Sequence, residues 1–246
     1  MTMKIIDMNL SVGGMDADGT VMDAAYLHRL MDTYRITEAV CWHQHALLDP
    51  ADGNRKMAEL SANSQGRLHT CAVLDPMLGA DSLPGTGSLT ERLRQLRPAC
   101  LRVFPTANRM VWHPFYWEEI LNAAQKLALP LIIDGEYTQD VFCNLPQMSR
   151  DYPDIKFILI RYGACNGRHI MPLIAKCSNV YFTIDRMLDH LQIEEIWEKY
   201  GIDKLLFGSG YPDRPMEGIL GLAMYANIPN DAREQILHKN WEVMAP

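Results

Sequence analysis

The stretch Lys156-Phe157-Ile158-Leu159-Ile160-Arg161 is a short apolar run between two longer segments with helical spacing. Its successive apolar side chains are typical of a strand that is buried on both faces of a parallel sheet. The same unit recurs in both directions along the chain. We expect strands at residues 4–9, 38–42, 68–74, 100–104, 131–134, 156–161, 180–184 and 204–209. We expect helices at residues 20–34, 54–64, 89–96, 115–127, 141–152, 169–177, 188–200 and 231–244.

Alternating strands and helices over 246 residues predict an α/β fold, a TIM-like (β/α)8 barrel with one domain at 1–246. An open doubly wound sheet is the competing architecture, and it would need a glycine-rich phosphate loop after the first strand. Val12-Gly13-Gly14 is too short a match to such a loop. Residues 214–230 form an insert before the last helix, and we expect this insert to fold over the barrel mouth.

The composition excludes several classes of partner. The formal net charge is -7 and the basic residues are scattered, which argues against nucleic-acid binding. No segment approaches the roughly 18 apolar residues of a membrane span, and the start lacks the apolar stretch of a signal peptide. The six cysteines lie far apart, so we expect reduced thiols and a cytoplasmic protein without cofactor.

A barrel of this kind carries its active site at the carboxyl ends of the strands. This rule alone selects the side chains that are expected at the mouth. They are Asn9, Ser11, His43, His45, Asp75, Arg102, Asp134, Glu136, Arg161, Asp185, Arg186 and Asp213.

Four of the strand ends share a pattern with a known family. The fragments at residues 6–11, 130–136, 157–163 and 206–212 resemble the amidohydrolase-related family, in its "amidohydrolase 2" branch. That family writes D-x-H-x-H, P followed by three apolar residues and H, F-I-L-x-H-x-G, and F-G-S-D-Y-P at these places. Leu74-Asp75-Pro76 and residues 235–240 add weaker matches in the same order. The resemblance implies a distorted barrel that hydrolyses or decarboxylates small ring or carboxylate substrates, and it implies that some lactonase relatives work without a metal.

At the positions where the resemblance puts metal ligands, this chain has Asn9, Ser11, Asp134, Arg161 and Gly210. Divalent metals of this class bind imidazole and carboxylate, and a single carboxylate does not hold zinc. We therefore expect no metal at this place. A guanidinium grips a carboxylate through two parallel hydrogen bonds, so Arg161 predicts an anion pocket instead.

These residues predict a metal-independent, lactonase-like hydrolase of a small carboxylate-bearing ester, lactone or amide. In this interpretation Arg102 and Arg161 hold and polarise the substrate, Asp134 is the general base, and His43 or His45 relays the proton. The further substrate-binding candidates are Asn9, Ser11, Glu136 and Asp185.

Three alternatives stay open. Arg102 could instead pair with Asp134 or Asp185, and Asp134 could be the partner of Arg161, because a buried arginine must be paired in either case. The protein could be a catalytically inactive homologue that binds a small acid or a protein partner. A metal could also have moved to His43 and His45 beside Asp75. Relatives often pair, so a homodimer fits each interpretation.

Overall fold

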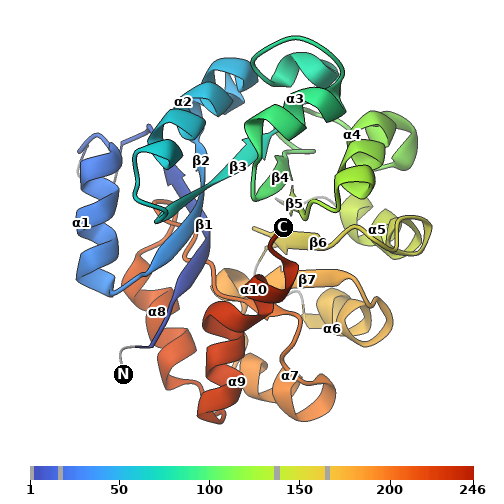
Figure 1. Cartoon of the computed structure of the whole chain (residues 1–246). Coiled ribbons are helices and arrows are strands. Elements are labelled where there is room, and N and C mark those ends of the chain that lie inside the picture. Colours follow the sequence, from blue (N-terminus) through green and yellow to red (C-terminus); the bar gives the residue numbers. More distant parts are fainter. Residues whose placement is uncertain (1–2, 16–18, 136–138, 164–166) are drawn as a thin grey trace.

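The computed structural model describes residues 3–15, 19–135, 139–163 and 167–246, and its sheet contains eight parallel strands (Figure 1). Each strand pairs with the next one along the chain. The strands are β1 (Ile6–Val12), β2 (Glu38–His43), β3 (Leu68–Val73), β4 (Cys100–Val103), β5 (Leu131–Asp134), β6 (Phe157–Ile160), β7 (Val180–Thr183) and β8 (Leu205–Leu206).

The barrel closes between β1 and the segment that begins with β8. The backbone N–H of Met8 donates to Phe207 O at 2.9 Å, and that of Gly210 donates to Asn9 O at 3.0 Å. Asp7 is fully buried at this seam, and its Oδ1 accepts from the backbone N–H of Asn9 and Ser209. The predicted single-domain (β/α)8 barrel is confirmed.

The α-helices other than the last one surround the strands on the outside of the barrel, and the last one lies across one end of it (Figure 1). The α-helices are α1 (Ala24–Tyr34), α2 (Pro50–Ala62), α3 (Leu89–Leu96), α4 (Pro114–Leu127), α5 (Gln139–Asp151), α6 (Gly167–Lys176), α7 (Gln192–Tyr200), α8 (Met216–Tyr225), α9 (Asn230–Glu234) and α10 (Asn240–Met244). Short helical turns are η1 (Gln44–Leu47), η2 (Gly79–Ser82), η3 (Ile184–Arg186) and η4 (Gln235–Lys239). Local signals set several helix starts: Ser88 and Glu91 form a capping box at α3, and Pro114 opens α4.

The insert at 214–230 does not fold over the mouth as expected. It contains α8, which lies in the outer ring near α1 (Figure 1). The Tyr34 hydroxyl of α1 donates to the Glu217 carboxylate of α8, so the two helices are in contact. Six of the ten residues of α8 are Met, Ile, Leu or Ala, and Met216, Ile219 and Ala223 are buried. The outer ring is where this apolar helix can bury that surface.

Two apolar layers hold the fold together. The larger one lies between the strands and the helices. The smaller one fills the barrel and includes Ile6, Met8, Ile132, Ile158 and Leu206. Trp241 and Met244 from α10 join this inner cluster, so the last helix closes one end of the barrel. Among the residues described, no helix has the length and apolar character needed to cross a membrane.

Candidate active site

A cavity of about 160 Å³ lies at the carboxyl ends of the strands, where this fold places active sites. The ends of β1, β2, β4 and β6 and the segment after β8 line it. The lining residues are Asn9, Ser11, Trp42, Gln44, Leu47, Arg102, Phe104, Arg161, Gly210, Tyr211 and Asp213. The sequence predicts that Asn9, Asp134, Arg161 and Gly210 converge on one cavity; three of them line it, and Asp134 lies behind its wall, bonded to Arg102 and Arg161.

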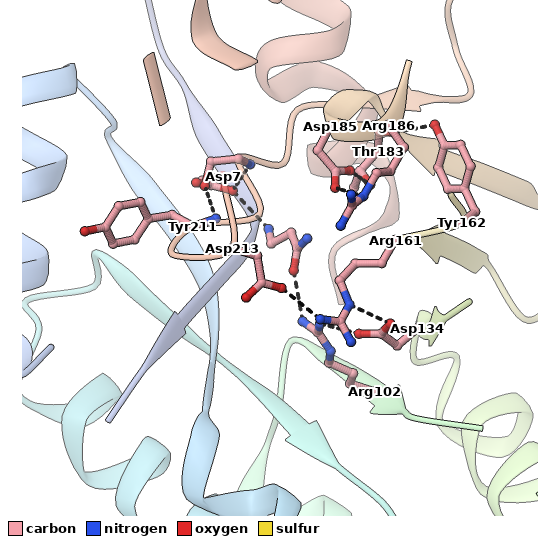
Figure 2. Close-up of polar contacts among 12 residues, drawn as sticks. Asp7, Arg102, Asp134, Arg161, Tyr162, Thr183, Asp185, Arg186, Tyr211 and Asp213 are labelled. Atoms are coloured by element: carbon pink, nitrogen blue, oxygen red, sulfur yellow. Dashed lines mark hydrogen bonds and ion pairs between the residues drawn. The ribbon is translucent and has the colours of Figure 1, made fainter. Parts of the chain in front are cut away.

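Asp134, at the end of β5, holds two arginines together (Figure 2). Its Oδ2 accepts from Arg102 Nη2 at 2.8 Å, and its Oδ1 accepts from Arg161 Nε at 2.9 Å. Its side chain is 1% exposed and does not line the cavity. Hydrogen bonds between charged partners at these distances are strong. Asp134 therefore faces the two guanidinium groups, the arrangement that the pairing alternative predicts.

Aromatic rings and polar side chains hold Arg102 in place. Its guanidinium carbon lies 4.6 Å from the Trp42 ring centroid and 4.8 Å from that of Phe104, which is cation–π geometry. Its Nη1 donates to Asn9 Oδ1 at 3.0 Å. The side chain is 3% exposed, so a fixed positive charge lies at the wall of the cavity.

Arg161 is the more accessible arginine, with a side chain that is 23% exposed. Its backbone has φ 47°, a left-handed conformation that costs a non-glycine residue roughly 1–2 kcal/mol. Its Nη1 donates to Asp213 Oδ2 at 2.8 Å. Asp213 is 49% exposed, so this pair faces the solvent while the pair with Asp134 does not.

Ser11 and Asn9 occupy the β1 side of the cavity. Gln44 Nε2 donates to Ser11 Oγ at 2.9 Å, and Ser11 Oγ donates to Tyr211 O at 3.4 Å. These contacts link β1 to the segment after β8. Both side chains are therefore polar groups in fixed positions at the edge of the cavity.

Asp185, predicted as a substrate contact, is buried in η3 just after β7. The Thr183 hydroxyl donates to its Oδ1, and Arg186 Nε lies 3.5 Å from its Oδ2 (Figure 2). Burial raises the pKa of this carboxyl above its ordinary value. Asp185 does not line the cavity itself but is a neighbour of Gly210, which does.

The side chains at the expected metal position do not suit a divalent cation. Asp134 already neutralises two guanidinium groups there, and Arg161 repels a cation. Nowhere in residues 3–15, 19–135, 139–163 and 167–246 do three or more His, Cys, Asp or Glu side chains form a group that could hold a metal ion. We therefore assign no chemical step to a metal.

His43 and His45 lie outside the cavity. β2 ends at His43 and the chain turns into η1, so the two side chains do not continue the alternation of the strand. The ring of His43 lies against Gly13, and its Nδ1 accepts from the backbone N–H of His45. Burial lowers the pKa of His43, which keeps it neutral at pH 7. His45 instead pairs with Asp52 at 3.2 Å, so neither ring is placed to relay a proton.

The other sequence candidates have separate positions. Asp75 Oδ2 accepts a hydrogen bond from Asn108 Nδ2 at 2.7 Å. Asp75 is not a partner in the contacts of His43 and His45 described above. Glu136 lies outside the described residues. Trp42, Phe104 and Gln44 line the cavity although the sequence interpretation gave them no role. Their signal was their place at or beside the ends of the strands at 38–42 and 100–104.

The family comparison agrees with this geometry. The model of the amidohydrolase family matches residues 89–240, which is more than half of the chain. A comparison of this chain with curated proteins found no match.

Several solved structures share the fold. An uncharacterised TIM-barrel protein from Bordetella bronchiseptica is 16% identical, with TM-score 0.78 and 98% of each chain covered. A 5-carboxyvanillate decarboxylase from Sphingomonas paucimobilis is 14% identical, with TM-score 0.74 and 99% of each chain covered. A dihydroxybenzoic acid decarboxylase from Polaromonas sp. JS666, solved with manganese and an inhibitor, is 16% identical. Its TM-score is 0.68, and the match covers 99% of this chain and 97% of that one.

Proposed function

Because this chain belongs to the amidohydrolase family, we propose that it is a metal-independent hydrolase of a small carboxylate-bearing ester, lactone or amide. The observation that carries the proposal is the arginine pair on Asp134 at the cavity. Arg161 occupies a position to which the family resemblance assigns a metal ligand, and Arg102 is bonded to the same carboxylate. They supply the electrostatic stabilisation that a Lewis acid would otherwise give to a developing oxyanion.

The cavity favours a small anionic substrate. A volume of about 160 Å³ equals the liquid volume of about five water molecules at roughly 30 Å³ each, so it suits a small acid. Trp42, Leu47 and Phe104 give it an apolar wall, and the arginines give it a charged one. Two of the structural neighbours are named as decarboxylases of aromatic acids, and a carboxylate is the group that an arginine pair binds well.

Asp213 marks the place where the substrate carboxylate would enter. It is a half-exposed carboxylate bonded to Arg161 Nη1 at 2.8 Å. An exposed ion pair contributes only about 0–1 kcal/mol, so an incoming carboxylate can replace it with little loss. Arg161 then holds the substrate while the buried charge of Arg102 stabilises the oxyanion.

The test is a panel of esters, lactones and amides that each carry one carboxylate, assayed before and after treatment with a chelator. We expect turnover that the chelator leaves unchanged. Arg161→Met should raise KM and lower kcat/KM by about 10-fold or more, the effect of losing one charged group that holds the substrate carboxylate. Loss of activity with the chelator, restored by a divalent metal, would refute metal independence.

A non-catalytic small-acid-binding protein is the second candidate. The hydrogen bonds of Asp134 favour this candidate, because both carboxylate oxygens already accept from arginines. Asp134 is therefore poorly placed to activate a water molecule. Calorimetric titration with succinate separates the two functions. Binding of succinate that Arg161→Met abolishes, together with no turnover across the panel, would establish the binding protein.

A further inference from the structure

Gly210 lies beside two buried polar side chains, Asn9 and Asp185. It lines the cavity and has φ 70°, a conformation that favours glycine. A Cβ atom built on Gly210 would lie 3.3 Å from Asp185 Oδ2 and 3.6 Å from Asn9 Nδ2. One acidic oxygen and one amide nitrogen therefore lie on the side of Gly210 that a side chain would occupy.

Both groups are fixed so that these atoms face this side of Gly210. Asn9 Oδ1 accepts from Arg102 Nη1, and this donor requires the amide oxygen on the Arg102 side. Asn9 Nδ2 then turns toward Gly210. Asp185 Oδ1 accepts from the Thr183 hydroxyl, which leaves Oδ2 on the Gly210 side. Both Asn9 Nδ2 and Asp185 Oδ2 are buried and have no hydrogen-bond partner.

Buried polar atoms of this kind need an explanation, because nearly all such atoms in proteins are hydrogen-bonded. The resting structure leaves a donor and an acceptor on the same side of Gly210, beside the cavity. A water molecule bound between these two atoms would satisfy both, because its oxygen accepts from the amide and its hydrogen reaches the carboxylate.

We propose that Asn9 Nδ2 and Asp185 Oδ2 hold the attacking water between them beside Gly210, and that Asp185 is the general base of the reaction. This inference rests on the proposed hydrolase function. One O–H bond of the water breaks and its proton moves to Asp185 Oδ2, while its oxygen bonds to the substrate carbonyl carbon. When the bond from that carbon to the leaving oxygen or nitrogen breaks, Asp185 returns the proton to the leaving atom. The products are an acid and an alcohol or amine, with one water consumed.

The surroundings of Asp185 suit this role. Burial raises its pKa, and the charges of Arg186 and Arg214 and the Thr183 hydroxyl oppose that rise in part. The Tyr162 ring is the other titratable neighbour, and burial raises the pKa of its hydroxyl far above its ordinary range, so it stays protonated. A general base works best when its pKa approaches the operating pH, and a buried carboxylate meets this condition better than an exposed one.

The other two carboxylates at the site are less suited. Asp134 has both oxygens bonded to arginines and does not line the cavity. Asp213 is 49% exposed and paired with Arg161. Asp185 Oδ2 makes no hydrogen bond and lies near Gly210 in the cavity wall. Asp7 Oδ2 also makes none, but Asp7 belongs to the seam of the barrel, where its Oδ1 accepts from the backbone of Asn9 and Ser209.

The decisive experiment compares Asp185→Asn with Asp189→Asn, the same chemical change on an exposed residue four positions along the loop. The substrate is the most active ester of the panel, and succinate binding is measured in parallel. We expect Asp185→Asn to lower kcat by about 100-fold or more with succinate affinity unchanged, and Asp189→Asn to change neither. Wild-type turnover in the Asp185→Asn protein would overturn the assignment of the base while leaving the hydrolase function in place.

A crystal structure gives a second test that needs no turnover. We expect a solvent atom within hydrogen-bond distance of Asn9 Nδ2 and Asp185 Oδ2, and we expect Gly210→Ala to displace it. Well-resolved density without a solvent atom at that point would overturn the proposal even if no substrate had been found.

Discussion

Asp134→Asn should destabilise the protein strongly, because it leaves a buried arginine without its counter-charge. Arg102 and Asp134 have side chains that are 3% and 1% exposed, and they are joined at 2.8 Å. Removing one partner of a buried ion pair costs about 3–5 kcal/mol. Most of this cost falls on Arg102, because Arg161 is 23% exposed and keeps Asp213 as a partner. We expect a loss of about 3–5 kcal/mol in the free energy of unfolding.

The matched control is Asp213→Asn. It removes the same charge from an equally short bond to Arg161, but the carboxylate is half exposed. Exposed pairs contribute about 0–1 kcal/mol, so the control should unfold within that range of the wild type. Urea unfolding at neutral pH, followed by circular dichroism, measures both variants.

A double variant tests the cause. Adding Arg102→Met to Asp134→Asn removes the buried charge that lacks a partner, so part of the lost stability should return. Equal stability of Asp134→Asn and Asp213→Asn would refute the reasoning. It would mean that the arginine pair is solvated and does not depend on Asp134.

Three further outcomes follow from the structure. Asp213→Asn should bind succinate more tightly than the wild type in calorimetry, because it removes the carboxylate that competes for Arg161; equal or weaker affinity would contradict the exchange. Burial raises the folded-state pKa of Asp185 above 3.8, so its contribution to stability is present at low pH and is lost as the pH rises through the folded pKa. The stability of Asp185→Asn relative to wild type should therefore increase from pH 4 to pH 7 in urea unfolding, and a decrease would be inconsistent with the buried charge. Gly53→Ala should cost about 1–3 kcal/mol because its Cβ would lie 2.4 Å from the η1 backbone, whereas Gly221→Ala in α8 has open space and should gain about 0.5–1 kcal/mol; thermal unfolding compares the two.

The barrel and its mouth were predictable because they depend on local patterns. Short apolar runs mark strands that are buried on both sides, and the fold places their carboxyl ends together. Asn9, Arg102 and Arg161 reach the cavity for that reason. The helix α8 was missed because Gly218 and Gly221 lower its helix propensity. Its position follows from packing against α1, which the local sequence does not record.

The prediction for the two histidines was wrong because it assumed that side chains keep alternating beyond the end of the strand. His43 and His45 would point the same way only in a continuous strand. The strand ends at His43, and η1 turns the chain at Gln44. The sequence gives no clear sign of this turn, because Gln44-His45-Ala46-Leu47 contains neither proline nor glycine.

The relation between Asp185 and Gly210 depends on tertiary structure alone. These residues follow different strands, and they meet because β7 and β8 are neighbours in the barrel. Where the family resemblance places a ligand aspartate, this chain has a glycine whose absent side chain would contact Asp185. The site would thus exchange a metal-bound carboxylate for a buried carboxylate one strand away. On this reasoning Arg102 and Arg161 stabilise negative charge, and the carboxylate that accepts the proton is a separate one, whose charged neighbours are Arg186 and Arg214.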